Sequence, residues 1–214
     1  MRNSLPFPQQ GLYVITRDPP GERANLLEEV KAAVRGGAAV VQYRAKEGRC
    51  SVDEARALLG VCRSASIPLI INDDIDLALK VGADGVHLGY VPNYLKQYAT
   101  ARKELGTKLI VGAEIKSSRH EAMCLGEKGA DYIAFGKDLT IKSKQDARLE
   151  QQELVAWWAE LFEVSCVALD IETPLEAKTV SEAGADFIAI KLPQEITFKT
   201  VEKLLAPYVA ALRS

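Results

Sequence analysis

Three polar residues stand at alternate positions where a short apolar run of the chain ends. Gln42, Arg44 and Lys46 are an amide, a guanidinium and an ammonium, and a single residue separates each from the next. In an extended strand, this spacing turns all three side chains to the same side. Donors that converge in this way suit a pyrophosphate or a carboxylate. The pattern predicts an anion site, and the alternative is a strand end that simply faces solvent.

A second polar group follows the next apolar run along the chain. Asn72, Asp73 and Asp74 are consecutive, and they offer carboxylates for Mg²⁺ together with an amide for a heterocycle. The alternative is helix capping, because Asp is a favoured N-cap residue and suits the first turn of a helix. The residues alone leave both interpretations open.

Both groups depend on a scaffold that gathers strand ends at one place. Eight apolar runs of four or five residues lack polar alternation, which is typical of strands buried on both faces of a parallel sheet. The expected strands are Leu12–Thr16, Ala39–Tyr43, Pro68–Ile71, Gly85–Leu88, Lys108–Gly112, Tyr132–Phe135, Ser165–Leu169 and Phe187–Ile190.

Longer amphipathic segments separate these runs. Ala24–Arg35 and Val52–Ser64 each place their apolar residues on one helical face. Eight strands, each followed by a helix, predict an α/β fold of the (β/α)₈ TIM-barrel type, with residues 1–214 as a single domain. Such barrels carry their chemistry at the carboxyl ends of the strands, where the polar groups above stand.

A Gly-Ala-Asp tripeptide recurs before three of the expected strands, at Gly82–Asp84, Gly129–Asp131 and Gly184–Asp186. The glycine ends a helix where a positive φ is often needed, and the chain then enters a strand. We interpret this repeat as structural, because it marks the end of the barrel opposite the expected site.

Composition limits the classes of function. The 214 residues are 48% hydrophobic and carry a net charge of −2, which gives no electrostatic reason to expect nucleic acid or a membrane surface. Neither a membrane-spanning run nor a signal peptide is expected, so we predict a cytoplasmic protein. Cys50 stands far from the other cysteines, and Cys62, Cys124 and Cys166 are expected to be buried rather than bound to zinc or paired in disulfides.

Neither histidine is assigned to catalysis. His87 ends an expected strand and is interpreted as a hydrogen-bonded core imidazole, whereas His120 opens a helix and is expected at the surface.

Taken together, these segments make the sequence similar to the thiamin phosphate synthase family over nearly its whole length. The resemblance rests on landmarks that occur in the family's order. They are Leu12-Tyr13-Val14-Ile15-Thr16, Val41-Gln42-Tyr43-Arg44-Ala45-Lys46, Ile70-Ile71-Asn72-Asp73, Gly82-Ala83-Asp84-Gly85-Val86-His87-Leu88-Gly89 and Gly129-Ala130-Asp131-Tyr132-Ile133-Ala134-Phe135-Gly136.

The resemblance implies a reaction of thiamin biosynthesis. The family joins hydroxymethylpyrimidine pyrophosphate to a thiazole phosphate with Mg²⁺, which releases pyrophosphate and gives thiamin phosphate. By this resemblance Gln42, Arg44 and Lys46 hold the pyrimidine pyrophosphate, Asn72 lies beside them, and Asp73 binds magnesium. Cationic groups and the metal stabilise the charge of the departing pyrophosphate.

Part of the family's pattern is replaced in this sequence. Pro92 stands where the family has its second magnesium carboxylate, and Glu114 and Lys116 replace a small hydroxyl residue and a histidine. Of the phosphate-holding loop before the sixth helix, only Ser143 and Lys144 correspond, and the resemblance implies that they bind substrate.

The replacement with the largest expected effect follows the seventh strand. The family has Gly-Gly there, so that backbone N–H groups approach the thiazole phosphate, whereas this chain has Asp170-Ile171. A carboxylate ~4 Å from a phosphate charge costs about 4 kcal/mol at an effective dielectric of 20, which is roughly three decades in affinity. We therefore expect thiazole phosphate to bind poorly.

Four charges of alternating sign end consecutive strands. Glu114, Lys137, Asp170 and Lys191 are expected to point into the barrel mouth and to pair with their neighbours, with Gln42, Arg44 and Lys46 left open beside them. Such a self-paired rim would close the thiazole half of the site. The alternative is a rim that recognises a different, zwitterionic ligand.

Two functions remain open from the sequence. One is an enzyme of thiamin biosynthesis, a Mg²⁺-dependent transferase whose activity in this copy is weak or altered. The other is a non-catalytic paralogue that binds a pyrimidine pyrophosphate or another small anion, or that has a regulatory role. The expected partner is a phosphorylated small molecule, and the sequence leaves open whether the protein is a homo-oligomer.

Overall fold

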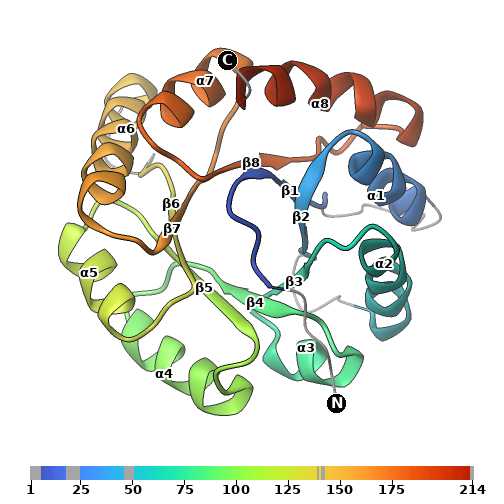
Figure 1. The fold of residues 1–214 in the computed structure, drawn as a ribbon, viewed down its shortest axis with the longest axis horizontal. Helices are drawn as coiled ribbons and strands as arrows, with labels where there is room; N and C mark the ends of the chain where they lie inside the picture. The colour runs from blue at the N-terminus through green and yellow to red at the C-terminus, as the bar shows by residue number, and fades with distance from the viewer. Residues whose placement is uncertain (1–5, 18–24, 46–50, 139, 141–142, 213–214) are drawn as a thin grey trace.

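The apolar runs form parallel strands that close on themselves. The computed structural model describes residues 6–17, 25–45, 51–138, 140 and 143–212. In it, each strand pairs with its sequence neighbours and β8 returns to β1, so that the sheet is a closed barrel (Figure 1). The strands are β1 (Gly11–Ile15), β2 (Ala38–Tyr43), β3 (Leu69–Asn72), β4 (Gly85–Leu88), β5 (Ile110–Ile115), β6 (Tyr132–Phe135), β7 (Ser165–Ala168) and β8 (Phe187–Lys191).

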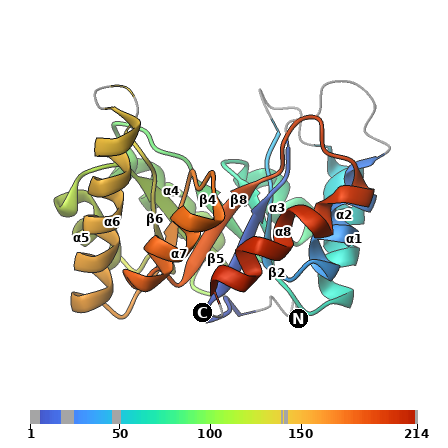
Figure 2. The same cartoon turned by 90° about the horizontal axis from the view of Figure 1, so that it is seen from above.

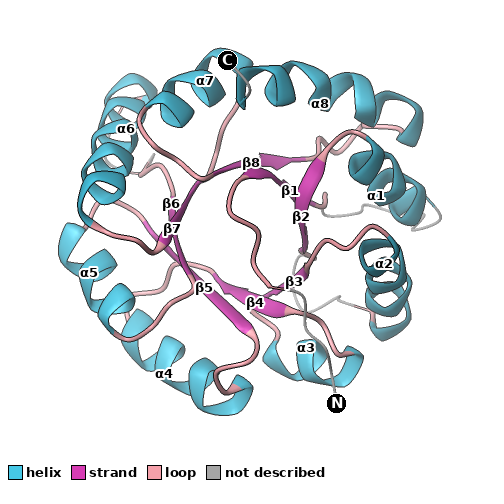
Figure 3. Cartoon of the chain, viewed as in Figure 1, coloured by secondary structure: helices cyan, strands magenta, loops and turns pink. Residues whose placement is uncertain are grey.

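In the described part of the chain, eight helices surround the barrel, one after each strand (Figure 3). They are α1 (Leu26–Arg35), α2 (Val52–Ser64), α3 (Ile75–Val81), α4 (Tyr94–Leu105), α5 (Arg119–Glu127), α6 (Lys144–Leu161), α7 (Pro174–Glu182) and α8 (Phe198–Leu212). Several of them begin at a polar residue whose side chain accepts a backbone N–H of the first turn, as Ser51 does for α2. The (β/α)₈ fold predicted from the sequence is confirmed.

Two hydrophobic clusters divide the core. One fills the layer between strands and helices, and the other, which includes Tyr13, Tyr132 and Phe187, lies inside the barrel. Phe7 packs on this inner cluster, with its ring centroid 4.7 Å from those of Tyr132 and Phe187. Because Phe7 precedes β1, it closes the amino-terminal end of the barrel, and Figure 2 shows the helices running alongside the strands.

The Gly-Ala-Asp repeat has the structural role that we predicted. Gly82, Gly129 and Gly184 have φ values of 77°, 84° and 104°, which favour glycine. The aspartate of each copy accepts a backbone N–H near the start of the preceding strand. These bonds join Asp84 to Leu69 at 2.9 Å, Asp131 to Val111 at 2.7 Å and Asp186 to Cys166 at 2.8 Å.

The fifth strand departs from its predicted bounds. It runs from Ile110 to Ile115 rather than from Lys108 to Gly112. Glu114 lies within β5 and does not end it. Because alternate residues of β5 face the inside of the barrel, the Glu114 side chain is directed at the barrel mouth. A charge at this position therefore does not mark a strand end.

Two of the three cysteines that were expected to be buried are buried. Cys62 and Cys166 are buried, as predicted, whereas Cys124 is only half-buried, so its predicted burial is wrong. Cys124 lies on α5 one turn after the exposed His120, and its Sγ is 3.6 Å from Nε2 of that histidine. Cys50 lies outside the described residues.

Within the described ranges, no helix combines the length and apolar character needed to cross a membrane.

Candidate functional site

A cavity of about 630 Å³ opens at the carboxyl ends of the strands. Apolar residues such as Ile15, Leu169 and Ile190 line it together with charged side chains from several strand ends. The charged residues of the lining are Arg44, Glu114, Lys116, Lys137, Asp170, Glu172 and Lys191. The size and the mixed apolar and charged lining of this cavity suit a small charged ligand.

The structure brings two of the three predicted anion-binding residues to this cavity. Gln42 and Arg44 both line it, as their period-2 spacing predicts, and Lys46 lies outside the described residues. Arg44 is exposed, but the prediction that Gln42 stays open is wrong, because Gln42 lies within β2 and is 1% exposed. Its Nε2 donates to Asn72 Oδ1 at 2.6 Å.

The residues after β3 divide between the two interpretations. Asp74 is the N-cap of α3 and accepts the backbone N–H of Leu77 at 2.8 Å, so capping explains this carboxylate. Asp73 is exposed and has a φ of 58°. Its Oδ1 accepts the Gly89 N–H at 2.7 Å, and its Oδ2 accepts from Asn72 Nδ2 at 2.6 Å. Asp73 is thus held in a fixed position at the edge of the barrel mouth.

A complete protein-made metal site does not form in the part of the chain that the structure describes. No group of three acidic, histidine or cysteine side chains there is arranged to hold a metal ion. Pro92 lies exposed in the turn before α4 and has no side-chain donor. Asp73 is therefore the single carboxylate that the predicted magnesium site retains.

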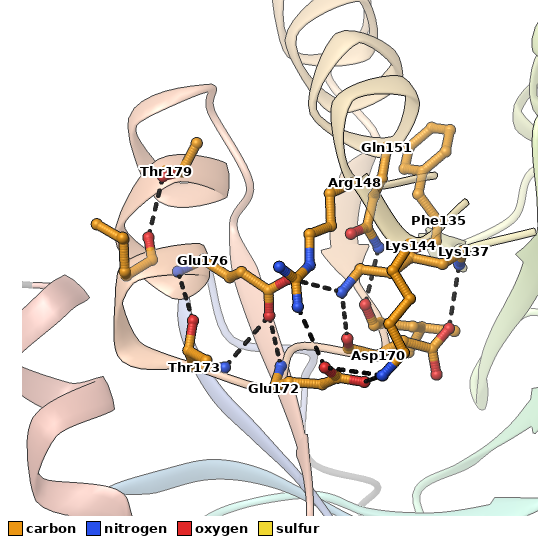
Figure 4. A network of polar contacts seen from close by, with 12 residues as sticks. Phe135, Lys137, Lys144, Arg148, Gln151, Asp170, Glu172, Thr173, Glu176 and Thr179 are labelled. Atoms are coloured by element: carbon orange, nitrogen blue, oxygen red, sulfur yellow. Dashed lines mark hydrogen bonds and ion pairs between the residues drawn. The ribbon is translucent and has the colours of Figure 1, made fainter. Parts of the chain in front are cut away.

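The predicted rim pairs only in part. The expected contact between Lys137 and Asp170 exists, but it runs through the backbone: the Lys137 N–H donates to Asp170 Oδ2 at 3.1 Å and Lys137 Nζ donates to the Asp170 carbonyl at 2.6 Å (Figure 4). The ion-pair partner of Lys137 is Glu176, at 3.0 Å. The prediction failed here because Glu176 belongs to α7 and not to a strand end.

Glu176 is the centre of a larger network. Its carboxylate accepts the backbone N–H groups of Glu172 and Thr173 at 2.8 and 3.2 Å, in the capping box that starts α7. Arg148, on α6, forms ion pairs with both Glu176 and Glu172 (Figure 4). The network ties α6 to α7 beside the cavity.

The two loop residues assigned to substrate by resemblance have other partners. Ser143 is the N-cap of α6, with the Asp146 N–H donating to its Oγ at 3.1 Å. Lys144 pairs with Glu172 at 3.2 Å. Neither side chain belongs to the lining of the cavity, although Thr140 of the same loop does.

Glu114 pairs toward β4 rather than toward Lys137. Its Oε2 lies 4.0 Å from Nε2 of His87, which is buried and also lines the cavity. His87 Nδ1 shares a hydrogen bond of 3.0 Å with the Tyr132 hydroxyl, as expected of a hydrogen-bonded core imidazole. The prediction did not include the position of His87 in the cavity lining. Burial raises the pKa of Glu114, but His87, Arg44 and Lys116 outweigh it, and the net pKa lies below the ordinary value.

The remaining replaced positions all lie at the cavity. Asp170 has a φ of 56°, a value that favours glycine, and Ile171 is buried against the core with 7% exposed. Lys116 lies over the Tyr90 ring, 5.8 Å from its centroid, and Lys191 is exposed at the end of β8.

Sequence reasoning missed Tyr208, which lines the cavity from α8 and donates to the Glu172 carbonyl at 2.9 Å. No spacing pattern indicates such a residue, because it reaches the site from the outer helix layer.

The fold and the site define a (β/α)₈ barrel protein with a cavity lined by charged residues at the carboxyl ends of its strands. The pattern of the family described as "Thiamine monophosphate synthase" matches residues 12–191. The chain belongs to this family.

Individual members of the same family are similar to this chain in sequence and in structure. The "Thiamine-phosphate synthase" of Erythrobacter litoralis is 38% identical over 188 residues, which cover 84% of this chain and 85% of the relative. That of Methylobacillus flagellatus is 40% identical over 191 residues, 88% of each chain. The structure of "Thiamine phosphate pyrophosphorylase from Pyrococcus furiosus" has a TM-score of 0.74 at 28% identity and covers 99% of this chain and 97% of that one.

Proposed function

We propose that this chain binds hydroxymethylpyrimidine pyrophosphate in the cavity and joins it to thiazole phosphate only slowly. Family membership supports the reaction, and the residues of the cavity support the loss of rate. Arg44 offers an exposed guanidinium at the mouth, where it can bind a pyrophosphate bidentately.

Magnesium fits this site only as an ion that arrives with its ligand. Asp73 offers one carboxylate, and each of its oxygens keeps acceptor capacity beyond the bond that it already makes. Mg²⁺ is commonly held by one or two carboxylates with substrate phosphates and water, so Asp73 would hold it together with the pyrophosphate. When bound, the ion would neutralise charge on the leaving pyrophosphate.

The observation that carries the proposed weakness is that polar groups after β6 and β7 already bond to one another at the cavity. Asp170 Oδ2 takes up the backbone N–H of Lys137 at 3.1 Å, and Lys137 Nζ binds the Asp170 carbonyl and Glu176. These donors are therefore already engaged and less available to a phosphate at this place. The Asp170 carboxylate also repels a phosphate.

We expect the purified protein to form thiamin phosphate at least about a hundredfold more slowly than a relative with Gly-Gly after its seventh strand. The measurement is product formation with Mg²⁺ and both substrates. A turnover equal to that of such a relative would contradict the proposal.

The replacement of the family's magnesium carboxylate by Pro92 and of its Gly-Gly by Asp170-Ile171 also favours a second function. In this alternative, the chain is a divergent paralogue that binds the pyrimidine pyrophosphate or another small anion without catalysis. Pyrophosphate binding with no product formation, even at saturating thiazole phosphate, would select this alternative over slow synthesis.

Replacing Arg44 with alanine is expected to weaken the binding of pyrophosphate about 10- to 100-fold, because a charge-assisted hydrogen bond contributes about 1.5–3 kcal/mol. Titration calorimetry with Mg²⁺ and inorganic pyrophosphate measures this change. Arg56→Ala, which alters an exposed arginine paired with Asp53 on α2, serves as the control. Equal losses in both variants would remove Arg44 from the site.

We also propose a cytoplasmic location, because Cys62, Cys124 and Cys166 are free thiols, as is usual in a reducing compartment. Sedimentation analysis can decide whether the protein is a homo-oligomer, which the sequence leaves open.

A further inference from the structure

Gln42 presents an unsatisfied oxygen in the cavity lining. Among the described residues, its buried Oε1 has no hydrogen-bond partner. The orientation of this amide follows from Asp73, since an ionised carboxylate only accepts hydrogen bonds. Asp73 Oδ2 is 2.6 Å from Asn72 Nδ2, so Asn72 Oδ1 faces Gln42 and accepts from Gln42 Nε2.

This chain of bonds makes Gln42 an acceptor toward the ligand. Turning its amide around would set two oxygens, Gln42 Oε1 and Asn72 Oδ1, against each other. A buried acceptor without a donor destabilises the folded protein, and native structures usually satisfy such groups with water or a ligand. A ligand that offers an N–H or O–H group meets this need.

Glu114 adds a second acceptor to the same cavity. Its carboxylate is partly exposed and lines the cavity, and the nearby His87, Arg44 and Lys116 favour its ionised form. The 4.0 Å that separates it from His87 Nε2 is too long for a hydrogen bond. The carboxylate therefore keeps capacity to accept from a ligand.

Gly136 leaves room for this carboxylate. A Cβ at that position would lie 3.0 Å from Glu114 Oε1, so any larger residue there would press on the carboxylate. Glu114 Oε1 thus lies close to the backbone of Gly136, the residue that follows β6.

We propose that Glu114 is a specificity residue of this cavity: with Gln42 Oε1, its carboxylate accepts hydrogen bonds from the amino group of a heterocyclic ligand. The cations at the mouth, Arg44 among them, hold the anionic end of the same ligand. The inference rests on the proposed function and deepens it, because it assigns the recognition of the aminopyrimidine ring to a residue that differs from the family's pattern.

Two ring probes without phosphate test this assignment on the full chain. One is 4-amino-2,5-dimethylpyrimidine, and the other is 4-methoxy-2,5-dimethylpyrimidine, which has no N–H donor. We expect the wild type to bind the amino probe at least about tenfold more tightly, as measured by ligand-observed NMR. Glu114→Gln and Glu114→Ser should each reduce this preference at least about threefold, while Glu104→Gln, an exposed site on α4, should not.

Equal binding of the two probes by the wild type, or binding of neither, would overturn the inference. An unchanged preference in both Glu114 variants would overturn it as well. Pyrophosphate binding, measured on the same samples, distinguishes a failure of this inference from a failure of the proposed function. If pyrophosphate fails to bind but the amino preference depends on Glu114, the proposed function is wrong and the role of Glu114 stands.

Discussion

Replacing Asp170 and Ile171 with glycine is expected to strengthen the binding of thiazole phosphate about 10- to 100-fold. The change removes a carboxylate and frees the Lys137 N–H that it occupies at 3.1 Å. Repulsion of about 4 kcal/mol at ~4 Å would give roughly three decades, but Asp170 is exposed and solvent screens part of it. The measurement is calorimetric titration with thiazole phosphate.

Matched variants separate charge from backbone shape. Asp170→Asn removes the charge and keeps the side chain, so it should recover part of the gain, and Asp170→Gly also relieves the positive φ of 56°. Pro92→Asp alone should leave thiazole-phosphate binding and turnover low, because Asp170 is still present. Recovery of activity by Pro92→Asp alone would show that the metal site, and not the phosphate half, limits the reaction.

The double variant needs a check on folding. Ile171 is 7% exposed and packs in the layer between strands and helices, so its truncation should destabilise the protein by about 2–5 kcal/mol. Asp170→Gly alone avoids this loss. The affinity is therefore compared only among variants whose urea unfolding shows a folded population above 95%.

The barrel could be predicted because parallel strands buried on both faces leave a plain signal. Runs such as Tyr132–Phe135 are apolar at every position, and they alternate with helices whose apolar residues keep to one face. The repeated Gly-Ala-Asp tripeptide predicted the first residue of three strands, β4, β6 and β8, correctly. β5 was misplaced because Glu114 looks like a strand end in the sequence, whereas its side chain simply faces the cavity.

The position of a site residue could be predicted where sequence spacing determines it. Its hydrogen-bond and ion-pair partners could not be predicted, because they come from other parts of the chain. Period-2 spacing correctly placed Gln42 and Arg44 at the cavity, but it could not show that Gln42 is buried and bonded to Asn72. Lys137 was expected to pair with neighbouring strand ends. Its partner, Glu176, is the third residue of α7, and only the path of the chain between β7 and α7 brings the two together.

Replacing Arg17 with methionine is expected to destabilise the fold by about 3–5 kcal/mol, since it leaves a buried carboxylate without its partner. Arg17, just after β1, binds both oxygens of Glu29 on α1 at 2.9 Å. The side chain of Glu29 is fully buried and that of Arg17 is 8% exposed. Arg17 also donates to the Gln194 carbonyl at 3.3 Å, so it joins β1, α1 and the segment after β8.

Urea unfolding of single and double variants tests this assignment. The double variant Arg17→Met with Glu29→Leu should recover most of the lost stability, because both charges then leave the interior together. The matched control is the pair of Arg35 and Glu202, which has a similar distance of 2.8 Å but side chains that are 57% and 50% exposed. Breaking that pair should change the unfolding free energy by about 1 kcal/mol or less. Similar losses at the two pairs would mean that burial does not set the strength of the Arg17 contact.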